Sequence, residues 1–169
     1  LYAVGLGPSR FVLNGYRVDP VTRALGGLVA TFELISPAGG DLYPTAVVVD
    51  PTGRYLYVGS DQSGGGIRTY TINRSTGALS LNGSDVFLGT SVSSLAMHPS
   101  GRFLHAADRI RRQIHTFEID LTTGRIAERG TPAVSGGIPR LAAAPSGRFL
   151  YAANVLDDTL SVFRVNPDT

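Results

Sequence analysis

The side chains of this sequence that are able to do acid–base or anion-binding chemistry are mainly carboxylates and arginines. The chain has 13 acidic residues, three histidines and no cysteine, and all 15 of its basic residues are arginine. No pair of histidines has the spacing of metal ligands, and no Gly-x-Ser-x-Gly motif marks a nucleophilic serine. The lack of cysteine excludes disulfides and thiolate chemistry. We therefore look for a site made of guanidinium and carboxylate groups, and we expect no metal and no cofactor.

Four of these residues stand where strand-like stretches begin or end. Asp61 follows one such stretch, Asp108 and Arg109 end the next copy of it, and Arg140 opens the following unit after a proline. Each residue also has a structural interpretation: Asp61 and Asp108 suit turns, Arg109 suits a solvated loop, and Arg140 suits a pair with a neighbouring acid. The residue types alone leave both interpretations open.

These residues are positioned by a repeated unit. The segment 50–60 recurs as 98–108 and as 144–154. Each copy holds a Pro-Thr/Ser-Gly turn, in which proline presets one backbone angle and glycine accepts a left-handed one. An Arg-aromatic-Leu strand with two apolar faces follows. An apolar strand precedes each turn, and an alternating strand that we expect near solvent comes next, before a looser outer strand ends the unit.

The N-terminal part fits the same register from the second strand of the unit onward. Residues 1–5 match the Arg-aromatic-Leu strand, and residues 24–34 match the outer strand. Arg23 replaces the glycine that closes the corresponding turn at Gly77 and Gly124. Because arginine accepts a left-handed conformation less readily than glycine, we expect this turn to be less regular.

The three histidines occupy structural positions of the repeat. His98 takes a turn position, and His105 takes the place of Tyr57, where we expect packing between units. His115 aligns with Arg68 on a strand face that we expect to be exposed. We assign none of the three to catalysis.

The strand pattern predicts an all-β fold of 14 strands without a helix. Four short strands per unit of about 45–50 residues are typical of a β-propeller blade. We divide the chain into about 3.5 four-stranded blades: a partial blade over 1–43, blades over 44–91 and 92–137, and a partial blade over 138–169. Because propellers need about four to eight blades to close, we expect a larger ring, completed by other blades or by a second copy.

Charge and hydropathy argue against two classes of partner. The net charge is only +2, and the arginines are spread along the chain apart from the group Arg109, Arg111 and Arg112. This distribution lacks the basic patch that nucleic acid binding requires. No apolar run approaches the roughly 20 residues that span a bilayer. We therefore expect neither nucleic acid nor membrane as a partner.

The repeat resembles a known family. The run Pro-Ser-Gly-Arg-Phe-Leu-Tyr-Ala-Ala-Asn at 145–154, and the strand that ends in Val-Phe-Arg-Val-Asn-Pro-Asp-Thr, are similar to the repeat of the seven-bladed propeller lactonases. That family includes the propeller-type bacterial 6-phosphogluconolactonase and the fungal carboxy-muconate lactonizing enzyme. The resemblance covers essentially the whole chain and implies a seven-bladed parent ring.

The resemblance also implies site residues. In the family a strand ends in Asn-Arg or Asp-Arg and the next blade opens with Pro-Arg, which here are Asp108-Arg109 and Pro139-Arg140. The preceding blade departs from the family: Thr45 stands where an arginine is expected, and Asp61 where a glutamate is expected. By resemblance, Arg109 and Asp61 are the catalytic candidates, and Arg140 and Asp108 are the substrate-binding candidates.

The implied activity is the metal-independent hydrolysis of a sugar-acid lactone such as 6-phosphogluconolactone. Arginine donors suit a developing oxyanion and an anionic sugar, and a carboxylate suits the activation of water. The expected partner is then a small lactone or an anionic sugar acid, and the expected location of a lactonase is cytoplasmic. The alternative function is a non-catalytic propeller that serves as a binding or interaction scaffold, because only Arg109 of four expected polar groups matches the family.

Overall fold

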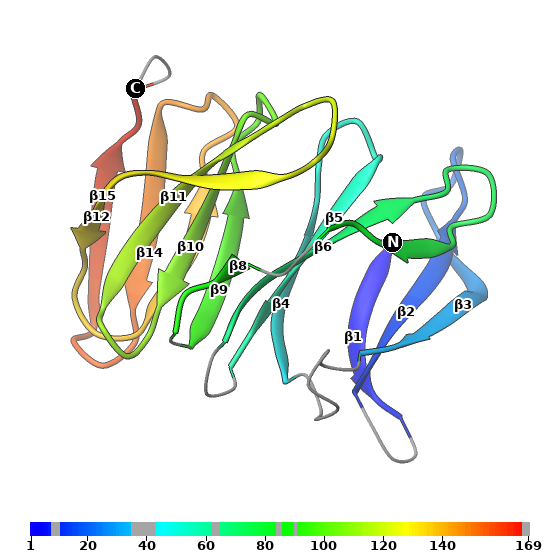
Figure 1. The fold of residues 1–169 in the computed structure, drawn as a ribbon, viewed down its shortest axis with the longest axis horizontal. Helices are drawn as coiled ribbons and strands as arrows, with labels where there is room; N and C mark the ends of the chain where they lie inside the picture. The colour runs from blue at the N-terminus through cyan, green and yellow to red at the C-terminus, as the bar shows by residue number, and fades with distance from the viewer. Residues whose placement is uncertain (8–10, 35–42, 62–64, 84–85, 90, 167–169) are drawn as a thin grey trace.

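The chain folds into four antiparallel sheets that stand side by side, as the computed structural model shows (Figure 1). The structure describes residues 1–7, 11–34, 43–61, 65–83, 86–89 and 91–166. These residues contain strands and no helix, so the all-β propeller fold with four-stranded blades is confirmed. Consecutive strands pair with one another in each sheet, as in propeller blades.

The first sheet consists of β1 (Tyr2–Leu6), β2 (Phe11–Val18) and β3 (Leu25–Glu33). The second consists of β4 (Pro44–Val49), β5 (Tyr55–Ser60), β6 (Gly66–Ile72), β7 (Leu79–Leu81) and β8 (Val86–Phe87). The third consists of β9 (Val92–Met97), β10 (Phe103–Asp108), β11 (Gln113–Ile119) and β12 (Ile126–Val134). The fourth consists of β13 (Pro139–Ala143), β14 (Phe149–Asn154) and β15 (Thr159–Arg164).

The predicted number of 14 strands was wrong by one. The outer strand expected over 78–88 is divided into β7 and β8, which both pair with β6 but at different places along it. Residues 84 and 85 of the expected strand lie outside the described residues. In the third sheet the outer strand β12 is continuous and pairs with β11 across one register shift.

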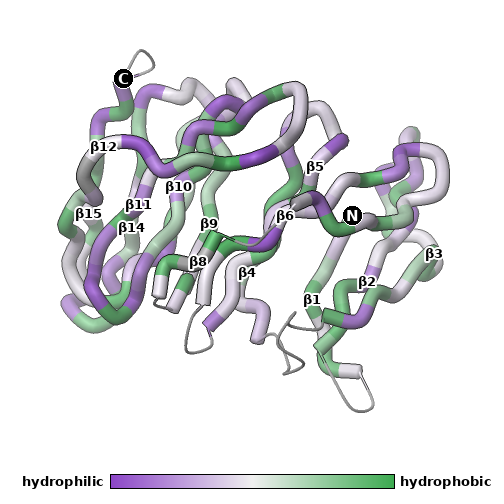
Figure 2. Tube along the Cα trace, in the orientation of Figure 1, coloured by the Kyte–Doolittle hydropathy of each residue, from purple (hydrophilic) through white to green (hydrophobic). Residues whose placement is uncertain are grey.

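The hydrophobic core forms three layers, each between two neighbouring sheets. Leu13 and Leu56 belong to the layer between the first two sheets, Tyr57 and Phe117 to the middle layer, and Leu150 to the last. Strands β5 and β10 are buried along their whole length, because each is covered on both faces. Figure 2 shows that the strands of the sheets carry both hydrophobic and hydrophilic residues.

The connections gather at two ends of the stack. The turn end contains the tight turns 50–54, 73–78, 98–102, 120–125 and 144–148. The loop end contains residues 61, 65, 88, 91, 109–112, 135–138 and 155–158, which are joined by backbone hydrogen bonds such as Arg109 N to Ser91 O and Val155 N to Ile138 O. The candidate site residues therefore have to be sought at the loop end.

The turn that contains Arg23 is as regular as its glycine counterparts, so the expectation of an irregular turn was wrong. Arg23 N donates to Asp19 O at 2.9 Å, as Gly77 N donates to Asn73 O at 2.7 Å. Arg23 adopts the same left-handed conformation, with φ of 59° against 74° for Gly77. The backbone keeps the geometry of the repeat, although the Cβ of Arg23 makes this left-handed conformation less favourable than it is for glycine.

Candidate functional site

Two of the predicted site residues meet at the loop end as an ion pair. The guanidinium of Arg109, which follows β10, lies 2.9 Å from a carboxylate oxygen of Asp61, which follows β5 of the neighbouring sheet. The Arg109 side chain is 43% exposed and that of Asp61 is 24% exposed. Because solvent screens such a pair, it adds little stability, and its charged groups stay accessible to a ligand.

Ser91 joins the two residues and was missed by sequence reasoning. Its hydroxyl donates a hydrogen bond to Asp61 Oδ1, and its carbonyl accepts one from Arg109 N at 3.0 Å. Ser91 is buried, at 5% exposure, so it supports the pair from the protein interior. A serine in a connection between units carries no pattern that distinguishes it from other loop serines, and only the fold brings it between these partners.

Asp108 lies next to Arg109 in the chain, but its side chain has a different environment. It is fully buried, and its Oδ1 accepts backbone hydrogen bonds from Ile110 at 2.8 Å and Arg111 at 2.9 Å. The Arg111 guanidinium lies 3.3 Å from the other carboxylate oxygen. In this arrangement Asp108 orders the turn that carries Arg109.

Arg140 and Thr45 lie on the inner strands of the two blades that flank the third sheet. The Arg140 guanidinium, on β13, donates to the backbone carbonyl of Ser93 on β9, and the residue is exposed. The Thr45 hydroxyl, on β4, donates to Val92 O, also on β9. Both side chains therefore connect adjacent inner strands. Among the described residues, Asp61 forms its ion pair with Arg109 and not with Arg140.

His115 is buried at 7% exposure, so the expectation of an exposed strand face was wrong. Its Nδ1 lies 2.6 Å from Glu128 on the neighbouring strand β12, and its Nε2 lies 3.8 Å from Asp108. The same face carries Phe117, whose ring stacks beside that of His115 and belongs to the core layer between the second and third sheets. The alternation of β11 indicates a two-faced strand but does not tell which face the next sheet covers.

The other two histidines serve the packing of blades. His98 lies in its turn, where Nε2 is 2.9 Å from Gly147 O of the next sheet. His105 is 4% exposed and its Nδ1 lies 3.0 Å from the Thr116 hydroxyl. Burial, with a smaller contribution from His98, lowers the pKa of His105 from 6.5 to about 4. His105 is therefore neutral in the folded protein near pH 7.

The described residues contain neither a metal-binding cluster nor a membrane-spanning helix. No three histidine, cysteine or acidic side chains in that part of the chain are grouped closely enough to hold a metal ion. No helix in the same residues is long and apolar enough to cross a membrane.

The chain is similar in sequence to known β-propeller proteins. Residues 84–169 match the family described as Lactonase, 7-bladed beta-propeller. A 6-phosphogluconolactonase of Formosa agariphila is 28% identical over 152 residues, which cover 79% of this chain and 42% of the relative. The chain thus spans less than half the length of that curated relative.

Solved structures are similar over nearly the whole chain. The periplasmic gluconolactonase PpgL of Pseudomonas aeruginosa is 26% identical with a TM-score of 0.69, over 98% of this chain and 47% of that one. A candidate 6-phosphogluconolactonase from Bacteroides uniformis is 19% identical with a TM-score of 0.78, over 99% of this chain and 48% of that one. The second likeness supports the fold alone.

Proposed function

We propose that this chain, which belongs to the family of seven-bladed β-propeller lactonases, supplies the loop-end site of a propeller that hydrolyses a sugar-acid lactone. The observation that carries the proposal is the accessible pair of Asp61 and Arg109. It offers a base and an oxyanion donor on adjacent blades. The names of the relatives favour a lactone such as 6-phosphogluconolactone as the substrate.

In the proposed reaction, the guanidinium of Arg109 binds the lactone carbonyl oxygen and stabilises the negative charge that develops on it. Asp61 accepts a proton from a water molecule as its oxygen bonds to the carbonyl carbon. The bond from that carbon to the ring oxygen then breaks, and the ring oxygen takes the proton as the hydroxyl of the open sugar acid. These steps need no metal and no cofactor.

The lactone has to displace part of the existing ion pair. Arg109 turns from Asp61 to the substrate, while Ser91 keeps its hydrogen bond to Asp61 Oδ1 and so holds the carboxylate in place. Asp108 acts in this proposal through the turn that presents Arg109, because its own side chain is fully buried. The exposed Arg140 is the candidate for an anionic group on the substrate, which arginine binds in a bidentate fashion.

A specific observation supports the alternative, a non-catalytic scaffold. Thr45 stands where the family resemblance implies a site arginine, and its hydroxyl is engaged with the carbonyls of Gly59 and Val92. In this interpretation the inner strands are linked for stability, and Asp61 is neutralised by Arg109.

The two functions are separated by a hydrolysis assay. We would follow acid release from 6-phosphogluconolactone and from gluconolactone at fixed pH, after recording the molar mass in solution by light scattering. The proposal predicts hydrolysis above the spontaneous rate, with kcat/KM reduced about 100- to 1000-fold by Arg109→Ala. A preference for the phosphorylated lactone that is lost in Arg140→Ala would assign Arg140 to the phosphate. A rate equal to the spontaneous one with both lactones would favour the scaffold.

A further inference from the structure

The tight turns that precede β5, β10 and β14 share one backbone conformation but differ in one side chain. Each turn closes with a backbone hydrogen bond of 2.8–2.9 Å, from the glycine N–H to the carbonyl of the residue three positions earlier. That earlier residue is Asp50 in the first turn, His98 in the second and Ala144 in the third. A side-chain hydroxyl follows two positions later each time, on Thr52, Ser100 and Ser146. Among these three turns, only 98–102 places an imidazole beside a serine.

Ser100 and His98 have the geometry of a nucleophile and its base. Ser100 Oγ lies 2.7 Å from His98 Nδ1, which is within the distance at which a base takes the proton of a hydroxyl. Ser100 is exposed, so reagents reach it from solvent, whereas His98 is only 7% exposed. Arg102 N donates to Ser100 Oγ at 3.2 Å. This bond uses one of the two lone pairs of the hydroxyl oxygen and leaves the other for attack.

The hydrogen bonds of His98 define which ring nitrogen carries the proton. Nε2 lies 2.9 Å from the carbonyl oxygen of Gly147, and because a carbonyl only accepts, Nε2 is the donor. The backbone N–H of Ser100 points at Nδ1 over 3.1 Å, and because that group only donates, Nδ1 is the acceptor. A neutral imidazole has one donor and one acceptor nitrogen. His98 therefore presents the lone pair of Nδ1 to the Ser100 hydroxyl.

The imidazole of His98 is fixed in orientation by its neighbours. The ring of Phe103 meets it edge-on, with ring centroids 6.0 Å apart and an interplanar angle of 84°. A Cβ placed on Gly147 would lie 2.6 Å from Nε2, so the ring occupies space that only a glycine leaves open. A base that is oriented by a third group is the arrangement that activates serine nucleophiles. Here the third group is the backbone carbonyl of Gly147.

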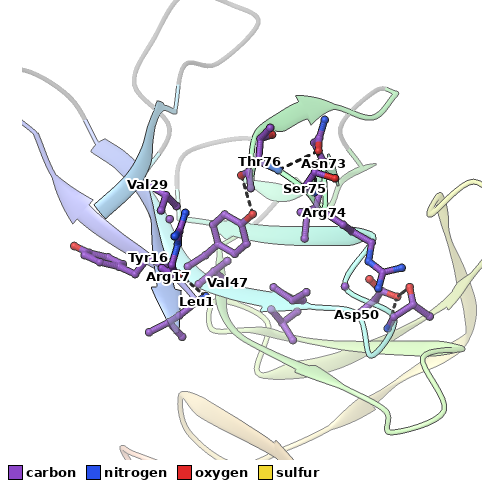
Figure 3. Close-up of a pocket in the computed structure, with 18 of the residues that line it drawn as sticks. Leu1, Tyr16, Arg17, Val29, Val47, Asp50, Asn73, Arg74, Ser75 and Thr76 are labelled. Carbon is purple, nitrogen blue, oxygen red and sulfur yellow. Dashed lines mark hydrogen bonds between the residues drawn. The ribbon is translucent and has the colours of Figure 1, made fainter. Parts of the chain in front are cut away.

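The turn of the second sheet, which holds Asp50 (Figure 3), shows the structural role of this position. Asp50 Oδ2 accepts hydrogen bonds from Thr52 N, at 3.0 Å, and from the Thr52 hydroxyl. His98 accepts the same two bonds from Ser100, so both side chains order their turn. Although burial raises the pKa of Asp50, the hydrogen bonds that it accepts lower it overall. Because a carboxylate with a lowered pKa is a poor base, Asp50 orders the turn without activating Thr52.

The turn of the fourth sheet has the hydroxyl without a base. Ala144 has no side-chain acceptor, and Ser146 Oγ accepts a hydrogen bond from Arg148 N at 3.4 Å. Ser146 is exposed, as Ser100 is. The two serines therefore differ chiefly in the presence of His98.

We propose that Ser100 and His98 form a nucleophile–base pair that becomes acylated by small carboxylic esters and then hydrolyses the acyl group. Ser100 Oγ bonds to the ester carbonyl carbon as His98 Nδ1 takes the hydroxyl proton. The bond from that carbon to the alcohol oxygen breaks, and the alcohol leaves with the proton. A water oxygen then bonds to the acyl carbon and gives a proton to Nδ1. The bond to Oγ breaks, Oγ takes that proton, and the acid is released.

Gly147 supports this reaction at a distance from the reacting atoms. When Nδ1 holds the proton, the imidazole is positively charged, and its hydrogen bond from Nε2 to the Gly147 carbonyl becomes charge-assisted and stronger. Gly147 lies 49 positions from His98 in the chain, which is why the sequence analysis assigned no histidine to catalysis. The pair lies at the turn end, and the inference does not rest on the proposed lactonase activity.

The probe is p-nitrophenyl acetate, an activated ester. We would quench the reaction with acid at several times and measure acetyl groups on Ser100 and Ser146 of the same molecules by peptide mass spectrometry. Lysine and cysteine, which compete for acetyl groups, are absent from the sequence. Because general-base assistance accelerates such an attack, we expect Ser100 to be acetylated at least about 100-fold faster than Ser146.

Two variants separate the base from the order of the turn. His98→Ala gives this turn the side chain of Ala144, and His98→Asp gives it that of Asp50, so each copies a turn that the protein already forms. Both should stay folded by circular dichroism. We expect the acetylation of Ser100 to fall about 100-fold in both variants. Retention of the order without the base in His98→Asp makes the fall specific to the imidazole.

Three results would overturn the proposal. The first is equal acetylation of Ser100 and Ser146 in the unmodified protein, a comparison that needs no variant. The second is an unchanged rate at Ser100 in His98→Asp, because turn order alone would then explain the reactivity. The third is faster acetylation of another serine of the chain than of Ser100.

Discussion

The two ends of the stack follow opposite rules. At the turn end the same bonds recur in the second, third and fourth sheets: Gly53 N donates to Asp50 O, Gly101 N to His98 O, and Gly147 N to Ala144 O, all within 2.8–2.9 Å. At the loop end the equivalent strands are followed by different side chains with different partners. Repetition at one end therefore indicates folding requirements, whereas the departures from the repeat at the other end mark where chemistry can be placed.

The largest expected effect is the loss of a turn-end anchor. Asp50 is 6% exposed and accepts backbone hydrogen bonds from Thr52, Arg54 and Tyr55 at 2.7–3.0 Å. Burial opposes the charge, but these bonds and that of the Thr52 hydroxyl outweigh it and lower the pKa of Asp50. Asp50→Ala leaves the N–H groups unpaired, so we expect a loss of about 3 kcal/mol in the free energy of unfolding, measured by urea denaturation.

The comparison of repeats supplies the control for Asp50. Ala144 forms the same turn in the fourth sheet without an acidic side chain. We expect Ala144→Asp to leave stability unchanged or to raise it by up to about 1 kcal/mol. A small effect of Asp50→Ala would show that the backbone turn suffices and that the side chain is dispensable.

A pH-dependent effect on stability is expected at His105, a buried histidine at the position that tyrosine occupies in the other copies of the repeat. The pKa of His105 is lowered by burial from 6.5 to about 4, so the unfolded chain binds the proton first. Stability from this group is complete above pH 6.5 and falls as the pH drops towards 4. Between pH 6.5 and 5 we expect a loss of about 2 kcal/mol.

The variant His105→Tyr tests that assignment, because tyrosine occupies the same position in β5 and β14. A groove of about 260 Å³ beside His105 leaves room for the larger ring. We expect the variant to lose the slope between pH 6.5 and 5 in urea denaturation. An unchanged slope would mean that other groups cause the pH dependence.

A smaller gain is expected at Arg23, where an arginine adopts the left-handed conformation of Gly77. Arg23→Gly removes the steric cost but makes the unfolded chain more flexible, so we expect a net gain of about 0.5–1 kcal/mol. Arg17→Gly, on the extended strand β2, is the matched control and should destabilise. Thermal unfolding of both variants checks the opposite signs.

Much of the fold follows from the sequence because repetition is visible in it. Each Pro-Thr/Ser-Gly turn defines two strands, and their spacing defines a blade. The division of one outer strand into β7 and β8, and the burial of His115, depend on contacts between blades that a single repeat does not encode.

The candidate site was less predictable than the fold. Asp61 and Arg109 were predicted through a family resemblance, and the structure brings them together across two blades. Ser91 was missed because its importance arises only from its two partners. Their roles in catalysis stay predictions.

The most direct test compares two arginines, one from each end of the stack. Arg109 at the loop end pairs with Asp61, whereas Arg148 at the turn end is an exposed member of the repeated turn. We would measure kcat/KM for 6-phosphogluconolactone in Arg109→Ala and Arg148→Ala, with unfolding free energies of both. We predict a loss of about 100-fold or more for Arg109→Ala and less than about twofold for Arg148→Ala, each within roughly 0.5 kcal/mol of wild-type stability. Equal rates in the two variants would contradict the assignment of chemistry to the loop end.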